Sequence, residues 1–162
     1  MSKPILLFQA PVATRSGYGS HSRDLVRSLI KSNKYDIHIV SMPWGDCPMN
    51  ALNQVKDKDI IDKIMRTPEL PRQPEIFIQV SVPNEFQKVG KFNIGITAGI
   101  ETTLCSAEWI EGLNRMDLNI VPSKHSKKVF DDTEYSAKDN QGNIVQKLKV
   151  TKPMEVLFEG AD

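Results

Sequence analysis

The chain has 162 residues, a length that suits one domain. Hydrophobic residues make up 40% and charged residues 25%, which is ordinary globular usage and predicts a folded core rather than disorder. Lysine and arginine number 21 against 20 aspartates and glutamates. The resulting net charge of +1 gives no reason to expect nucleic acid or an anionic membrane as a partner.

Cysteine and histidine usage argues against a metal centre. Cys47 and Cys105 are far apart and form no C-x-x-C pair, which excludes a disulfide framework and a cysteine-based zinc site. The three histidines also lack metal-ligand spacing, so we predict no metal. No apolar run approaches the roughly 20 residues that span a bilayer, and the first run is too short for a signal peptide. We therefore expect a soluble, cytoplasmic protein.

The first half of the chain alternates strand patterns with helical patterns. Residues 5–8 form an unbroken apolar run, typical of a strand covered on both faces. Residues 23–31 carry one apolar stripe of helical period, and residues 36–41 form a second strand. A helix is predicted over residues 54–66, where four apolar side chains share one side.

The second half continues the alternation. Further strands are predicted over residues 75–82, 93–98, 118–121 and 154–158, and further helices over 106–116 and from Ser123 to about residue 131. Residues 135–152 are more polar and contain a turn signal at residues 140–143, which predicts a small β-hairpin inserted at the surface. The whole pattern predicts an α/β fold: a Rossmann-like parallel sheet with helices on both faces.

A glycine-rich segment, residues 11–20, separates the first strand from the first helix. Ligands of open parallel sheets bind beyond the carboxyl ends of the strands, and Gly17 and Gly19 allow close approach of the backbone. Ser20 or Ser22 is expected to cap the helix, whose first amides then suit a phosphate. A dinucleotide fingerprint fails because Ser22 replaces its third glycine, so an oxidoreductase is disfavoured. A tight turn with no ligand is the alternative.

Other candidate residues also follow predicted strands. Glu101 comes after the fourth predicted strand. A carboxylate there is a candidate general base for a sugar hydroxyl, or a group that orients one; the alternative is an acidic residue that precedes the next helix and has no catalytic role. Trp44 and Asp46 follow the second strand and are candidates for an acceptor pocket, because sugars stack on aromatic faces; burial in the core is the alternative for Trp44. His21, beside the glycine-rich segment, is the one histidine that we single out for substrate contact.

Three segments of the sequence, together with its last four residues, resemble the motifs of one known family. The first is Ser16-Gly17-Tyr18-Gly19-Ser20-His21-Ser22-Arg23, which is similar to the family's glycine-rich loop and first helix. The second runs from Gly95 to Thr102 and includes Glu101, with Trp109-Ile110 following. The third is Asp117 to Ser126, containing Val121-Pro122-Ser123 and followed by Val129-Phe130. Glu159-Gly160-Ala161-Asp162 is similar to the family's passage into a second domain. The family that these segments resemble is that of the GT-B glycosyltransferases of the GT4-like group, and among them those of large tailed bacteriophages.

The resemblance implies a function and a set of site residues. It implies that residues 1–162 form a single Rossmann-like domain, the acceptor-side half of a glycosyltransferase whose donor domain is absent from this chain. Gly17, Tyr18, Gly19 and Ser20 would contact donor phosphate and Glu101 would be catalytic, with His21, Trp44 and Asp46 on the acceptor side. The nucleotide sugar is a substrate, and no cofactor or metal is implied.

The expected partners are a nucleotide-sugar donor, an unknown acceptor and a second chain that supplies the donor domain. In this family the cleft lies between two domains, and one domain alone supplies a single wall of it. Such a half-cleft cannot align donor with acceptor, so we expect the chain alone to be nearly inactive. The alternative is a non-catalytic phage binding or structural protein that retains the fold. The sequence leaves the sugar, the acceptor and the stereochemical outcome open.

Overall fold

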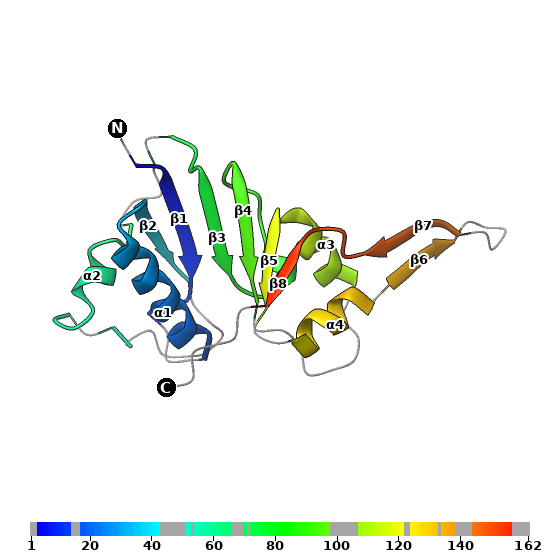
Figure 1. The fold of residues 1–162 in the computed structure, drawn as a ribbon, viewed down its shortest axis with the longest axis horizontal. Helices are drawn as coiled ribbons and strands as arrows, with labels where there is room; N and C mark the ends of the chain where they lie inside the picture. Colours follow the sequence, from blue (N-terminus) through cyan, green and yellow to red (C-terminus); the bar gives the residue numbers. More distant parts are fainter. Residues whose placement is uncertain are drawn as a thin grey trace. The chain divides into compact units, whose positions relative to one another are not determined.

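A computed structural model of the chain describes residues 3–13, 17–42, 51–52, 54–65, 70, 72–97, 107–121, 124–132, 134–138 and 144–156. It contains a six-stranded sheet and a separate two-stranded sheet (Figure 1). The strands are β1 (Ile5–Ala10), β2 (Asp36–Ser41), β3 (Ile76–Val80), β4 (Phe92–Ile96), β5 (Leu118–Val121), β6 (Glu134–Lys138), β7 (Ile144–Lys149) and β8 (Met154–Val156). The helices are α1 (Gly17–Ser32), α2 (Lys58–Ile61), the 3-10 turn η1 (Pro83–Glu85), α3 (Ala107–Arg115) and α4 (Lys124–Asp132).

The larger sheet has the strand order β2-β1-β3-β4-β5-β8. β1 pairs in parallel with both β2 and β3, and β5 pairs in parallel with both β4 and β8. The chain therefore runs from β1 outward to β2 and then returns to the other side of β1 to form β3. This reversal makes the boundary between β1 and β3 the topological switch point of a doubly wound sheet. The predicted α/β fold with a Rossmann-like parallel sheet is confirmed.

The chain divides into two compact units. The first comprises Met1–Ser81 with Lys88–Asn93, and the second comprises Val82–Gln87 with Ile94–Asp162. In the first unit β1 is deeply buried, because it has a neighbour on each side and an apolar side chain at nearly every position. Ile5, Leu6 and Phe8 are at most 1% exposed, as the unbroken apolar run predicts.

Helix α1 is longer than the apolar stripe indicates. It begins at Gly17, six residues before the predicted start, and ends at Ser32. Asn33 follows with a positive φ of 54°, the left-handed conformation that commonly ends a helix. Its amide donates to the carbonyl of Ile30, at 3.1 Å. The helix therefore ends at Ser32, because Asn33 adopts the left-handed conformation, which asparagine tolerates.

The helix predicted over residues 54–66 is wrong in length, because α2 is a single turn from Lys58 to Ile61. The chain then bonds to the outer strand β2 instead of continuing the helix. The amide of Ile39 donates to the carbonyl of Lys63 at 2.9 Å, and that of Met65 donates to the carbonyl of Ile39 at 2.8 Å. Ile64 thus forms an isolated parallel bridge with Ile39. Backbone partners distant in sequence compete with the helical ones here and replace them.

In the second unit α3 packs closely on η1. A Cβ atom placed on Gly112 would lie 1.7 Å from the carbonyl oxygen of Pro83, so only glycine permits this contact. Ile110 and Leu113 are fully buried along the same helix, and so is Met116, the residue that follows it. The rings of Trp109 and Phe130 lie 6.2 Å apart between centroids, joining α3 to α4.

The predicted hairpin is confirmed as the antiparallel pair β6–β7, with a register irregularity between Ala137 and Lys138. Asn114 of α3 anchors the returning strand. Its Nδ2 donates to the carbonyl of Lys149 at 2.8 Å, and its Oδ1 accepts from the amide of Thr151 at 2.7 Å. The final strand, β8, is described as far as Val156, so residues 157–158 of its predicted range lie outside the described residues.

Candidate functional site

The candidate site lies in the first unit, where β1 ends and α1 begins. β1 ends at Ala10, and the next helix, α1, begins at Gly17 (Figure 1). β1 and β3 flank the switch point, and ligands of doubly wound sheets bind beyond the carboxyl ends of the strands there. The amino terminus of α1 is therefore close in sequence and topology to the position that such a ligand occupies.

The four residues predicted to contact phosphate are helical rather than part of a loop. Gly17, Tyr18, Gly19 and Ser20 form the first turn of α1. The prediction that Ser20 or Ser22 caps this helix is wrong, because both lie inside it. Glycine is tolerated in a first turn because the amides there have no acceptor within the helix, so a flexible residue disrupts few helical hydrogen bonds.

The buried face of α1 is formed by small residues near its amino end. Gly19 is buried, and Ser22 and Val26 are both 0% exposed. These positions follow helical spacing, so they form one inward stripe. A stripe without bulky side chains at its amino end lets that end of a helix approach its neighbours closely.

Backbone and side-chain bonds hold the connection that follows β1. The carbonyl of Ala10 accepts from the amide of Val12 at 2.9 Å and from that of Met42 at 3.0 Å. Nη1 of Arg23 in α1 donates to the carbonyl of Val12, also at 2.9 Å. Val12 itself is 0% exposed. Ala10 is therefore bonded to the residue that follows β2, and Val12 is bonded to α1, which places the guanidinium of Arg23 beside Val12.

The electrostatics of this helix end favour an anion. The first turn of α1 contains no acidic residue, so no carboxylate of its own opposes the partial positive charge of the helix amino terminus. Arg23 brings a full positive charge to the connection after β1. A phosphate or carboxylate group of a ligand would meet both.

Polar side chains also occupy the carboxyl halves of the strands. Gln9 of β1 stands opposite Gln79 of β3, and Gln79 is only 3% exposed. Ser41, at the end of β2, pairs with Ala10, and its Oγ is buried with no hydrogen-bond partner among the described residues. Such groups in an otherwise apolar sheet cost free energy to bury. They mark this edge as more polar than the core that supports it.

Several predicted site residues lie outside the described part of the chain. These are Glu101, Trp44 and Asp46. His21 is placed in α1 by its backbone, as are Tyr18 and Ser20, and their side chains are not described. The structure therefore places Gly17–Ser20 and His21 on the first two turns of one helix.

Sequence reasoning missed Arg23 and Gln79 as candidate site residues. Arg23 could have been found from the sequence, because it is a basic residue that closely follows the glycine-rich segment and so falls near the start of the first helix. Gln79 had no signal of its own, because its importance comes from standing opposite Gln9 on a neighbouring strand.

No group of three or more histidine, cysteine, aspartate or glutamate residues in the described part of the chain is arranged to hold a metal ion. Among the same residues, no helix combines the length and the apolar character that crossing a bilayer requires. Comparisons with models of known protein families, with curated proteins and with solved structures find no match to this chain.

Proposed function

We propose that this chain is the amino-terminal, acceptor-side domain of a GT-B-type glycosyltransferase. It transfers a sugar from a nucleotide-sugar donor to an acceptor when a second domain, on the same or another chain, completes the cleft. The observation that carries the proposal is the amino terminus of α1, the first helix after β1, which borders the switch point of the sheet. The resemblance of the sequence segments to this family supports the choice of reaction.

The donor phosphates are the part of the substrate that this helix end is suited to bind. Gly17, Tyr18, Gly19 and Ser20 contribute the first turn, where the helix carries roughly half an elementary positive charge. Arg23 adds a basic side chain next to that turn. Stabilising the negative charge of a leaving nucleoside diphosphate is the main electrostatic task in sugar transfer without a metal.

The acceptor side of the proposal rests on sequence. Glu101 acts there as a general base on the acceptor hydroxyl or orients it, which requires hydrogen-bond reach to that hydroxyl. His21, Trp44 and Asp46 contact the acceptor. No cofactor takes part, because the nucleotide sugar already carries the activated bond that is broken.

Calorimetric titration with nucleoside diphosphates and nucleotide sugars tests the proposal. The unmodified chain is expected to bind at least one of them with a millimolar or lower Kd. Arg23→Gln should weaken that binding about tenfold, the loss of one charge-assisted contact. Gly19→Val should abolish it, with circular dichroism used to check that the variant folds.

Lys31→Gln is the matched control, because it removes an exposed positive charge from the last turn of the same helix. It should bind nucleotides as the unmodified chain does. If no nucleotide binds to the folded, unmodified chain, the transferase proposal is wrong and the non-catalytic alternative is favoured.

A further inference from the structure

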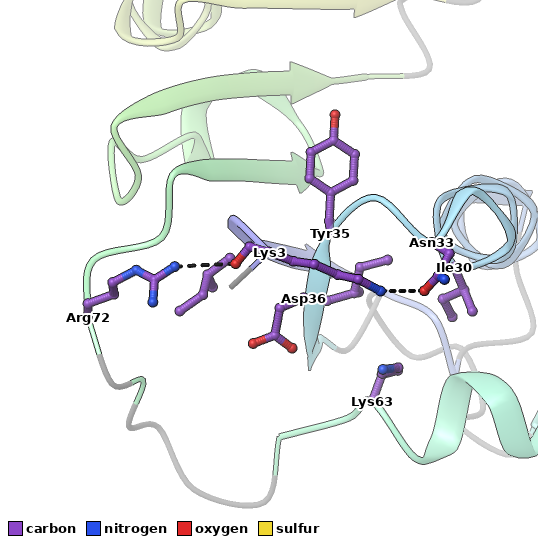
Figure 2. A pocket seen from close by; sticks show the side chains of 9 residues that line it. Lys3, Ile30, Asn33, Tyr35, Asp36, Lys63 and Arg72 are labelled. Carbon is purple, nitrogen blue, oxygen red and sulfur yellow. Dashed lines mark hydrogen bonds between the residues drawn. The ribbon is translucent and has the colours of Figure 1, made fainter. Parts of the chain in front are cut away.

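A cavity of about 340 Å³ lies at the opposite ends of the same strands. Ile5 and Asp36, the first residues of β1 and β2, line it, so it is located at the amino edge of the sheet in the first unit. Figure 2 shows Asp36, Lys63 and the Lys3–Asn33 pair bordering the same space. The complete lining is Lys3, Ile5, Ile30, Asn33, Tyr35, Asp36, Ile37, Lys63 and Arg72.

Three cationic side chains line this cavity, and they differ in the hydrogen bonds and ion pairs that they already form. Arg72 is held on one side, because its Nε donates to Glu75 at 2.8 Å and its Nη2 to the carbonyl of Lys3 at 3.3 Å. The ammonium of Lys3 donates to the neutral side-chain oxygen of Asn33 (Figure 2). In the described part of the chain, no ion pair joins the ammonium of Lys3 or of Lys63 to a carboxylate. Among the described residues, these two ammonium groups at the cavity thus form no ion pair.

One carboxylate opposes these cations within the lining. It belongs to Asp36, whose Oδ2 lies 3.2 Å from Nε2 of His38. Glu75 does not line the cavity. Its two carboxylate oxygens accept hydrogen bonds from Arg72 and from the amide of Ile5. The lining therefore has three positive charges and one negative charge. Ile5, Ile30 and Ile37 form its apolar part.

We propose that this cavity binds a small anion through a phosphate group, with Lys3 and Lys63 as the principal ligands. Lysine ammonium groups are common phosphate ligands that act as point charges with several donors. At about 30 Å³ for each water volume, the cavity has room for an anion of the size of pyrophosphate. The site is independent of the glycosyltransferase proposal, because it lies at the amino edge of β1 and β2 rather than beyond their carboxyl ends.

Titration of the isotope-labelled chain with inorganic pyrophosphate at constant ionic strength, followed by amide NMR, tests this site. Saturable shifts are expected at Asn33, Asp36 and Lys63. Lys63→Gln should raise the Kd about fivefold or more, since it removes one of the two ammonium groups that bind the anion. Asp36→Asn should lower the Kd, because it removes the opposing carboxylate. The control Lys31→Gln, which changes the net charge equally outside the cavity, should leave the Kd unchanged.

Three results would overturn the site. The first is the absence of saturable shifts around the cavity in the unmodified chain. The second is an equal Kd for Lys63→Gln and Lys31→Gln, both with folded spectra. The third is a set of shifts confined to Gly17–Ser20, which would assign the anion to the amino end of α1. This last result would count against the cavity and in favour of the site in the proposed function, so the two proposals can fail separately.

Discussion

The two edges of the sheet in the first unit are stabilised by different chemistry. At the carboxyl edge, uncharged and mostly small residues pack closely, among them Ala10, Val12 and Ser22, all 0% exposed. At the amino edge, side chains bond to each other and to the backbone. There Glu75 joins Arg72 to the amide of Ile5, at 2.8 Å and 2.6 Å.

This difference bears on how each edge could bind a ligand. The carboxyl edge offers a helix terminus and backbone groups, to which Arg23 adds one basic side chain. The amino edge offers lysine and arginine side chains whose charges can be removed singly. A change in packing should therefore disturb binding at the carboxyl edge more than at the amino edge, where side-chain charges supply all the proposed ligands.

The amino edge also contains a buried amide clamp. Oδ1 of Asn93 accepts from the amides of Val89 and Gly90, at 3.0 Å and 2.9 Å, and its Nδ2 donates to the carbonyl of Gly90 at 3.0 Å. Asn93 is 3% exposed, so these bonds form away from water, where unpaired groups are costly. The clamp fixes the turn that leads into β4.

The largest effect is expected from Gly90→Val, which breaks the packing of the amino edge. A Cβ on Gly90 would lie 2.9 Å from both Cβ and N of Phe77 and 3.1 Å from the carbonyl oxygen of Pro74. Because two of these atoms belong to the backbone, the strand must shift, at a cost of about 3 kcal/mol. Urea unfolding measures the loss.

Lys91→Ala is the control for this variant, since it changes the exposed neighbouring residue. It should alter the free energy of unfolding by less than about 0.5 kcal/mol. A Gly90→Val variant as stable as this control would show that the turn at the amino edge is not closely packed.

A smaller loss is expected from Val12→Ala at the carboxyl edge. The side chain is fully buried, so removing two methyl groups should cost about 2 kcal/mol through lost burial and the cavity left behind. No titratable group is removed, so the loss should be the same at pH 3 and pH 7. Urea unfolding at both values provides the measurement, and a pH-dependent difference would contradict the contrast between the edges.

The smallest effect at neutral pH, and the most specific, is expected from Glu75→Gln. Hydrogen bonds from Arg72 and from the amide of Ile5 lower the pKa of Glu75 to about 2 from an ordinary value of 4.5. A carboxyl group whose pKa is lower in the folded state stabilises the fold above pH 4.5, and that contribution is lost as the pH falls from 4.5 towards 2. The unmodified chain should therefore lose more stability over this range than Glu75→Gln does.

Unfolding curves collected across this pH range compare the two chains directly. Arg72→Gln should reproduce the reduced acid dependence, because it removes the main cause of the lowered pKa. Identical acid dependence in the unmodified chain and in Glu75→Gln would mean that the ion pair does not persist in solution.

Local sequence pattern was sufficient for the class of fold. The apolar run at residues 5–8 became the buried strand β1, and the polar segment around the turn signal at 140–143 became the hairpin β6–β7. Burial on two faces demands an unbroken apolar run, and a hairpin demands a turn between paired strands, so each requirement is visible within a few residues.

The tertiary structure alone decided where α1 begins, where α2 ends and which charges meet. α2 stops early because Ile64 pairs with Ile39 on β2, and the amino-edge cavity gathers Lys3, Asp36 and Lys63 from three distant parts of the chain. Gln9 likewise meets Gln79 only through the pairing of β1 with β3. Hydrogen bonds and charges act over a few ångströms in space, whereas periodicity reports only on neighbours along the chain. For this reason the sequence could predict the elements but not the cavity between their ends.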